Sequence, residues 1–372
     1  MKKTFLLLAV SLLFIGQIIA AGPEAGVNII SVGNTYADPQ FKGEALDQLF
    51  KELKARGIER ISLRVTWATM ERQEGSLNPE VLAEMKRIFG KAHDYGFKAM
   101  LDFHTFFAKD SYACPPWVAQ HLQDDQSPGL RSIAMLGRSE GVRKRYLAHI
   151  TGVLGELKDC AAIDVVSVMN EPLSLEWDNP ARWRADVDQI QNVIEAAAGI
   201  VREIAPGRKV AARFSGLVNP WTKNPGRSFD PARMLKALDI VGQNIYMDPD
   251  DDHATEPEKL KKGMLPSLTW EIAAEAAERC REAGKLFWIT EFGCPWHDNE
   301  RKEDFERQRK YYESTCKRLW SPAIRPDAVM AWVLSPNPIT RDSNGLYDGT
   351  TGKFHPAFDV YTRYIQGQNS KE

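Results

Sequence analysis

Two glutamates stand at the carboxyl ends of apolar segments that have the composition of buried strands. Glu171 follows Val165–Met169 and Asn170, and Glu291 follows Leu286–Thr290. Burial disfavours a charged group that has no partner, so carboxylates at these positions need a reason. Two carboxyl groups about 5 to 5.5 Å apart can cleave a glycosidic bond with retention of configuration, one attacking the anomeric carbon and the other protonating the leaving oxygen. Glutamates facing each other over a bound sugar would suit this chemistry.

The chain alternates short apolar segments with amphipathic ones, which predicts strands alternating with helices. Strands are expected at Val27–Ile30, Arg60–Val65, Lys98–Phe103, Ile163–Met169, Lys209–Phe214, Ile240–Tyr246, Leu286–Thr290 and Ala328–Leu334. Parallel neighbours need a crossover connection, so eight β units with helices between them favour an α/β fold, the closed (β/α)8 TIM barrel. A doubly wound open sheet is the alternative.

Helices are expected where apolar residues recur at helical spacing, at 45–53, 81–92, Val142–Lys158, Ala181–Ile204, Leu268–Ala283 and Phe305–Trp320. The stretch His104–Gly137 is too long for an ordinary connection and contains Pro115, Pro116 and Trp117, which favours an active-site loop. No linker, repeat or low-complexity tract divides the chain. The sequence therefore predicts a single catalytic domain over residues 22–372.

Reacting groups of a TIM barrel gather where its strands end at the C-terminal face. Beside the two glutamates, the residues expected there are Arg64, His104, Asn170, Tyr246 and Trp332. A guanidinium near Glu291 would keep that carboxylate ionised, because arginine is always charged. Glu171 must instead begin protonated if it is to donate a proton. A bell-shaped dependence of rate on pH is then expected.

The segments around both glutamates resemble a known enzyme family. They read Val168-Met169-Asn170-Glu171-Pro172 and Trp288-Ile289-Thr290-Glu291-Phe292-Gly293, and they look like the paired signatures of clan A glycoside hydrolases, most like family five, the cellulase family. Further matching segments are Arg64 in strand two, Trp67 with Glu71 and Gly75, Leu101–His104, Asn244–Tyr246 and Ala331-Trp332. One departure is Asn244, because family five usually has a histidine two residues before the tyrosine.

The resemblance implies a retaining β-glycoside hydrolase that cleaves β-linked glucan- or mannan-type polysaccharides or oligosaccharides by double displacement. It implies that Glu171 is the acid/base and Glu291 the nucleophile. It also implies that Asn170 binds the sugar 2-hydroxyl and that Arg64 and Tyr246 orient Glu291. His104 would be a histidine of the substrate site, and the ring of Trp332 would be the surface on which a sugar stacks.

Composition restricts the partners. The chain of 372 residues has 48 basic and 50 acidic residues and a formal net charge of −2, so it lacks the basic surface that nucleic acid or an anionic membrane would require. This balance suits an uncharged sugar. No metal and no organic cofactor are expected, since no histidine or cysteine pair has ligand spacing. Asp248–Asp252 resembles the start of a calcium loop, but His253 and Lys259 occupy the positions of its glycine and final glutamate.

The N-terminal segment predicts export. Lys2 and Lys3 precede an apolar run, Phe5–Ala20, which ends at Ala20-Ala21-Gly22. This pattern is typical of a secretory signal peptide, here residues 1–21, and an uncleaved membrane anchor is the alternative. Export would place the mature protein in the periplasm or outside the cell, where disulfides can form. Among the five cysteines, Cys280 and Cys316 are expected to pair.

Two other functions compete with glycoside hydrolysis. Gly137–Gly141 matches the nucleophile elbow of a serine hydrolase, which would use Ser139 with His297 or His355. Ser139 also suits the N-cap of a helix, and this reading leaves both glutamates unexplained. The second competitor is a sugar-binding barrel without catalytic activity.

Overall fold

The computed structural model describes most of the chain outside its two ends and several connecting segments. The described residues are 22–29, 41–104, 115–121, 136–172, 183–214, 220–221, 228–246, 270–293, 302–334, 345–348 and 351–367. The predicted signal segment, the histidine His297 and the acidic run Asp248–Asp252 lie outside these ranges. Within them, no helix is long and apolar enough to cross a bilayer, and no cluster of acidic, histidine or cysteine side chains could hold a metal.

Eight strands close into one parallel barrel, as predicted, and the open-sheet alternative is wrong. The strands are β1 Glu24–Asn28, β2 Arg60–Thr66, β3 Lys98–His104, β4 Ile163–Asn170, β5 Lys209–Phe214, β6 Ile240–Ile245, β7 Leu286–Phe292 and β8 Ala328–Ala331. Each strand pairs with its neighbours in chain order, and β1 pairs with β8. The carboxyl ends of all eight strands therefore meet at one mouth of the barrel.

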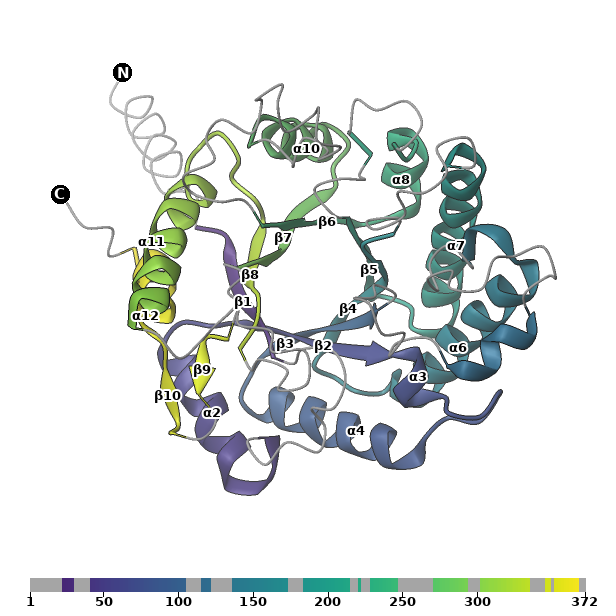
Figure 1. Ribbon diagram of the computed structural model, residues 1–372, viewed down its shortest axis with the longest axis horizontal. Helices are drawn as coiled ribbons and strands as arrows, with labels where there is room; N and C mark the ends of the chain where they lie inside the picture. Colours follow the sequence, from purple (N-terminus) through teal and green to yellow (C-terminus); the bar gives the residue numbers. More distant parts are fainter. Residues whose placement is uncertain are drawn as a thin grey trace, which may run out of the picture.

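Helices surround the barrel on its outer side (Figure 1). They are α2 Gly43–Ala55, α3 Trp67–Met70, α4 Pro79–Asp94, the 3-10 helix η3 Pro116–His121, α6 Glu140–Leu157, α7 Trp183–Ile204, α8 Pro231–Ala237, α10 Trp270–Glu282, α11 Lys302–Leu319 and α12 Pro356–Ile365. A small antiparallel pair, β9 Tyr347–Asp348 and β10 Lys353–Phe354, precedes α12. The last helix packs beside α11, and its Tyr361 hydroxyl bonds to backbone groups of β1 and β8, where the barrel closes.

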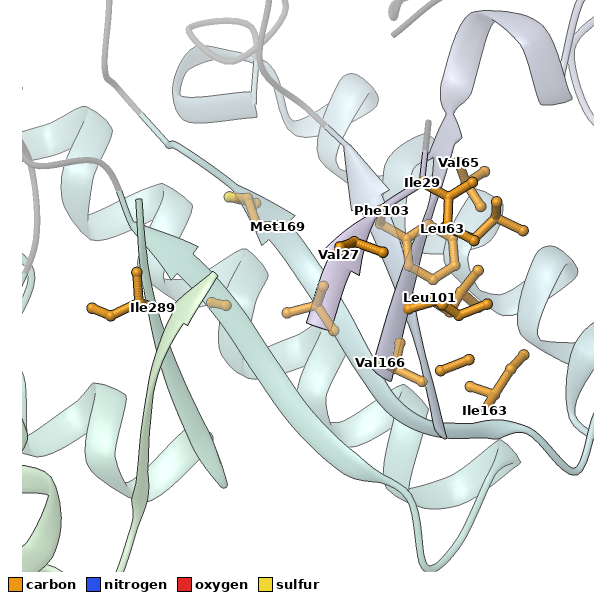
Figure 2. Packing of buried hydrophobic residues seen from close by; sticks show 14 of the residues in the cluster. Val27, Ile29, Leu63, Val65, Leu101, Phe103, Ile163, Val166, Met169 and Ile289 are labelled. Atoms are coloured by element: carbon orange, nitrogen blue, oxygen red, sulfur yellow. The ribbon is translucent and has the colours of Figure 1, made fainter. Parts of the chain in front are cut away.

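The strands alternate between two apolar layers, because successive side chains of a strand point to opposite faces. Facing the helices is a layer that includes Leu63 and Val65 of β2 beside Leu101 and Phe103 of β3 (Figure 2). Inside the barrel a second, smaller cluster comprises Met100, Val165, Ala211, Ile240, Trp288, Ala328 and Met330. This inner cluster forms an apolar layer below the polar residues at the barrel mouth.

The amino-terminal end of the barrel holds its own buried ion pairs. Arg60 at the start of β2 is 2% exposed and binds Asp164 at 2.6 Å and Glu24 at 2.9 Å. Its guanidinium also lies 4.4 Å from the centre of the Trp288 ring. This arginine balances charge at the end of the barrel opposite to the two glutamates.

The predicted disulfide between Cys280 and Cys316 is wrong. Both residues are free thiols that lie in α10 and α11 and are completely buried in the apolar layer under the helices. Burial raises the pKa of the Cys280 thiol to about 12 and that of Cys316 well above its usual value. Each sulfur packs as a small apolar group within this layer. A late position in each of two successive helices is therefore not enough to predict that the two cysteines form a disulfide.

Candidate active site

The polar side chains at the barrel mouth follow from the alternation of each strand. Above Met100 of the inner apolar cluster, Asp102 and His104 are the next residues of β3 with the same spacing of two. Arg64 occupies the corresponding level of β2, where its backbone pairs with Asp102. All three side chains are at least 96% buried. Period two thus places a charged layer directly above the apolar one.

Glu291 accepts hydrogen bonds on both of its carboxylate oxygens. Arg64 Nη2 and Arg213 Nη2 both donate to Oε1, and the Tyr246 hydroxyl donates to Oε2. Glu291 is only 4% exposed, so the two guanidinium groups supply the positive charge that a buried carboxylate needs. The structure therefore brings Arg64 and Tyr246 to Glu291, as the sequence predicts, and it adds Arg213.

Arg64 also connects the carboxylate to the other predicted residues of the site. Its guanidinium lies 3.9 Å from the centre of the Trp332 ring, and Nη1 lies 3.4 Å from His104 Nε2. Trp332 directly follows β8 and is 5% exposed, and His104 ends β3 at 2% exposure. Stacking of a planar guanidinium on an aromatic ring is favourable and holds both groups in place.

Glu171 sits in an unusual backbone conformation directly after β4. Its φ is 47°, a left-handed value that side chains other than glycine rarely adopt. Its backbone N–H donates to Arg213 O at 2.7 Å, and Oε1 accepts a hydrogen bond from Asn244 Nδ2 at 2.8 Å. Strain of this kind persists where the surroundings determine the conformation, and it is common at functional sites.

The Glu171 carboxyl has a strongly shifted acidity. Burial, and then the negative charge of Glu291, raise the pKa of Glu171 to about 7. The hydrogen bond from Asn244 and the positive charges of Arg64 and Arg213 oppose this shift. Because the charge of Glu291 acts on Glu171, the two carboxyl groups belong to one electrostatic site, and Glu171 is about half protonated near neutral pH.

Asn244 is fully engaged by polar neighbours. Its Nδ2 donates to Asn170 Oδ1 at 3.2 Å as well as to Glu171, and its Oδ1 accepts a hydrogen bond from the Thr290 hydroxyl at 2.8 Å. Asn170, the last residue of β4, is 1% exposed. It shares the donor Asn244 Nδ2 with Glu171 and therefore lies beside the acidic pair, as predicted. An uncharged amide here donates to Glu171 without adding charge at any pH, whereas a histidine would become cationic on protonation.

Sequence reasoning missed Arg213 and gave no role to Asp102. Arg213 is the next-to-last residue of β5 and is completely buried, with Nη1 2.6 Å from Asp102 Oδ2. Asp102 also lies 3.3 Å from Arg64 Nε, so it is the counterion of both arginines. The available signal was an arginine inside the otherwise apolar end of the strand Lys209–Phe214.

Trp67, Glu71 and Gly75 form a separate cluster beside the site. Glu71 accepts hydrogen bonds from Trp67 Nε1 at 2.9 Å and from Gly75 N at 2.6 Å, and His149 Nδ1 lies 3.1 Å from its Oε2. The φ of Gly75 is 73°, which suits glycine. Trp117 Nε1 donates to Glu71 O, which ties η3 to the same place. These contacts hold the segment after β2 in position.

Ser139 caps a helix. Its hydroxyl accepts a hydrogen bond from Val142 N at 3.2 Å at the start of α6 and donates to His121 O at 2.6 Å. His355, one of the two histidines considered as its catalytic base, caps α12 and lies 2.7 Å from Gly345 O through Nδ1. The N-cap interpretation of Ser139 is thus confirmed.

One family model matches most of the sequence. The model for cellulase, glycosyl hydrolase family 5, covers residues 20–323. The chain belongs to glycosyl hydrolase family 5. The family 5 protein is accordingly a glycoside hydrolase, and neither a serine hydrolase nor a sugar-binding barrel without activity is supported. A search of curated proteins gives no match.

Solved structures share the barrel of this family 5 protein. GH5_18 from Streptomyces cattleya, solved in complex with GlcNAc, is 14% identical with a TM-score of 0.67 over 95% of this chain and 82% of that chain. An exo-β-1,4-mannosidase from Opitutaceae bacterium strain TAV5 is 15% identical, with a TM-score of 0.62 over 93% and 59%. Endo-glycoceramidase II from Rhodococcus sp. is 16% identical, with a TM-score of 0.60 over 92% and 78%. At these identities the likeness shows the fold.

Replacement of Glu171 by glutamine is expected to stabilise the protein at alkaline pH. The pKa of Glu171 is raised from 4.5 to about 7 on folding, so stability falls as pH rises between these values. Glutamine keeps an acceptor for Asn244 and cannot ionise. We expect the free energy of unfolding of Glu171→Gln to exceed that of the wild type by about 2 kcal/mol at pH 8, and by much less at pH 5. Urea unfolding at both pH values measures this, and equal differences would contradict the raised pKa.

Proposed function

We propose that this family 5 enzyme is a retaining β-glycosidase that hydrolyses β-linked glucose- or mannose-containing oligosaccharides or polysaccharides. Glu291 is the nucleophile and Glu171 the acid/base. The observation that carries the proposal is the contrast between these two carboxyl groups. Glu291 is held by two arginines and a tyrosine, whereas the pKa of Glu171 is raised to about 7 beside it.

In the first step Glu291 attacks the anomeric carbon as the bond to the leaving oxygen breaks. Glu171 gives its proton to that oxygen, so the products are the leaving sugar with a free hydroxyl group and a glycosyl ester of Glu291. The ester is uncharged. It removes the charge that helped to raise the pKa of Glu171, while the positive charges of Arg64 and Arg213 remain. Glu171 then ionises readily and becomes a base.

In the second step a water molecule attacks the same carbon. Glu171 takes its proton, the bond to Glu291 breaks, and the electron pair returns to the carboxylate. Asn170 and Trp332 provide a hydrogen-bonding amide and a ring beside the reacting carbon. Two inversions at this carbon leave the product in the β configuration.

Mannose is the first sugar to test. A variant of GH5_18 from Streptomyces cattleya was solved in complex with Manβ1-4GlcNAc, and the Opitutaceae enzyme is an exo-β-1,4-mannosidase. Both share the barrel of the present protein, and their names support a β-mannoside as a member of the proposed substrate class.

A substrate panel tests the function. We expect the wild type to hydrolyse at least one member of a set containing manno- and cello-oligosaccharides, mannan, β-glucan and the aryl β-glycosides of mannose, glucose and xylose. Proton NMR of the first sugar released is expected to show the β anomer. Release of the α anomer would exclude the retaining mechanism, and absence of hydrolysis across the panel would contradict the proposed substrate class.

We further propose that the enzyme acts outside the cytoplasm. The support is the basic and apolar segment of residues 1–21, which precedes the barrel. N-terminal sequencing of the exported protein is expected to begin near Gly22. Retention of the apolar segment on a membrane-bound protein would favour the anchor instead.

A further inference from the structure

Arg213 contacts both members of the acidic pair. Its backbone carbonyl accepts the N–H of Glu171 at 2.7 Å, and its side chain donates to Glu291 Oε1. The guanidinium is completely buried and also donates to Thr290 O at 3.1 Å, next to Glu291 in the chain. Asp102 holds the other end of the guanidinium at 2.6 Å. A displacement of this side chain would therefore reach both carboxyl groups.

The two oxygens of Glu291 have different surroundings. Oε1 accepts from Arg64 and Arg213, which are 4% and 0% exposed. Among the described residues, the donor to Oε2 is Tyr246, which is 36% exposed. Oε1 thus lies on the buried, cationic side of the carboxylate, and Oε2 lies on the side of the partly exposed Tyr246.

We propose that Arg213 is a positioning residue that, together with Arg64, holds Oε1 of Glu291 as the carbonyl oxygen of the glycosyl ester and leaves Oε2 to bond to the anomeric carbon. This inference rests on the proposed function. In the first step the bond from Oε2 to the anomeric carbon forms, the glycosidic bond breaks, and the leaving oxygen takes the proton of Glu171. In the second step the oxygen of a water molecule bonds to the anomeric carbon and the water gives a proton to Glu171, while the bond to Oε2 breaks and its electrons return to the carboxylate.

The arrangement favours the second step in particular. Arg64, Arg213, Asp102 and Glu291 carry two positive and two negative charges, which balance in the free enzyme. Formation of the ester removes one negative charge, and departure of the carboxylate restores it. A guanidinium on Oε1 therefore stabilises the departing carboxylate more than the ester, which lowers the barrier to hydrolysis of the intermediate. Before the first step the same contact stabilises the free carboxylate, so it does not accelerate attack.

The test compares the two steps in Arg213→Met, which keeps an unbranched chain as far as the position of Nε and removes the charged end of the guanidinium. Asp102 still has Arg64 as a counterion, since Arg64 Nε lies 3.3 Å from it in the wild type. The probe is the 2,4-dinitrophenyl β-glycoside of the sugar that the wild type accepts best. We expect kcat to fall about 10- to 100-fold, the loss of one charged hydrogen bond, while kcat/KM changes less than about fivefold. KM falls accordingly, a burst of dinitrophenol appears, and the mass of the glycosyl-enzyme is detected in the steady state.

Two further variants separate this role from a structural one. Arg213→Lys keeps the charge and is expected to recover part of kcat and to reduce the burst. Arg60→Met removes a buried arginine from the opposite end of the barrel, where it pairs with Glu24 and Asp164, and is expected to show neither burst nor fall in KM. Equal losses of kcat and kcat/KM in both Arg213 variants, without accumulation, would overturn the proposal for Arg213 even if the wild type is an active retaining enzyme. A wild type without glycosidase activity would overturn the proposed function itself.

Discussion

Glu291→Gly is expected to lower kcat/KM for a 2,4-dinitrophenyl β-glycoside by about 10⁴-fold or more, because the double displacement cannot begin without the carboxylate. Glycine also removes the whole side chain of Glu291 and leaves space in its place. Sodium azide can enter that space and attack the anomeric carbon directly. A single displacement inverts the configuration, so the expected product is the α-glycosyl azide, identified by NMR.

The stereochemistry of this product decides the assignment. If Glu291→Gly yielded the β-glycosyl azide, the nucleophile would remain intact and Glu291 would have another role. Glu24→Gln is the control, since Glu24 is also bound by an arginine but is only partly buried and lies at the other end of the barrel. We expect its kcat/KM to stay within about threefold of the wild type, as befits a partly exposed ion pair remote from the reaction.

The barrel could be predicted from the sequence because strands of a parallel sheet are buried on both faces and read as short apolar runs between amphipathic helices. Their ends were less certain. β7 continues through Phe292, and β8 stops at Ala331, where the sequence pattern extends to Leu334. The final helix α12 was missed, although Tyr361 on it closes the seam between β1 and β8. Contacts of this kind join residues far apart in the chain and leave no local pattern.

The site was predictable to the extent that its residues end strands. Arg64, Tyr246 and Glu291 meet as expected because the ends of parallel strands share one mouth. Arg213 was not predicted as a site residue because it lies one residue before the end of β5, and its partner Asp102 lies within β3. Spacing along one strand says which face a side chain takes, but it does not say which residue of another strand lies opposite. Which charged residues pair inside the barrel could therefore be learned only from the structure.

Glu171→Ala is expected to produce a loss of activity that depends on the leaving group. An oligosaccharide leaves as a poor alkoxide and needs the proton of Glu171, so its hydrolysis should fall about 10³- to 10⁴-fold. Dinitrophenol leaves without a proton. Formation of the glycosyl-enzyme from the dinitrophenyl glycoside should therefore change less than about tenfold, and the slow second step should produce a burst. Azide is expected to speed this step and to give the β-glycosyl azide, since it attacks the intermediate.

The pH dependence provides an independent measure of the same residue. In the wild type, kcat/KM for an oligosaccharide is expected to fall as pH rises through about 7, because the raised pKa of Glu171 marks where the acid loses its proton. The alkaline limb should be absent from the residual activity of Glu171→Ala on the dinitrophenyl glycoside. If that limb persisted at the same pH in the variant, another group would be the acid. The shift itself arises from burial and then from the charge of Glu291, so in the proposed mechanism the nucleophile also helps to keep the acid protonated until the attack occurs.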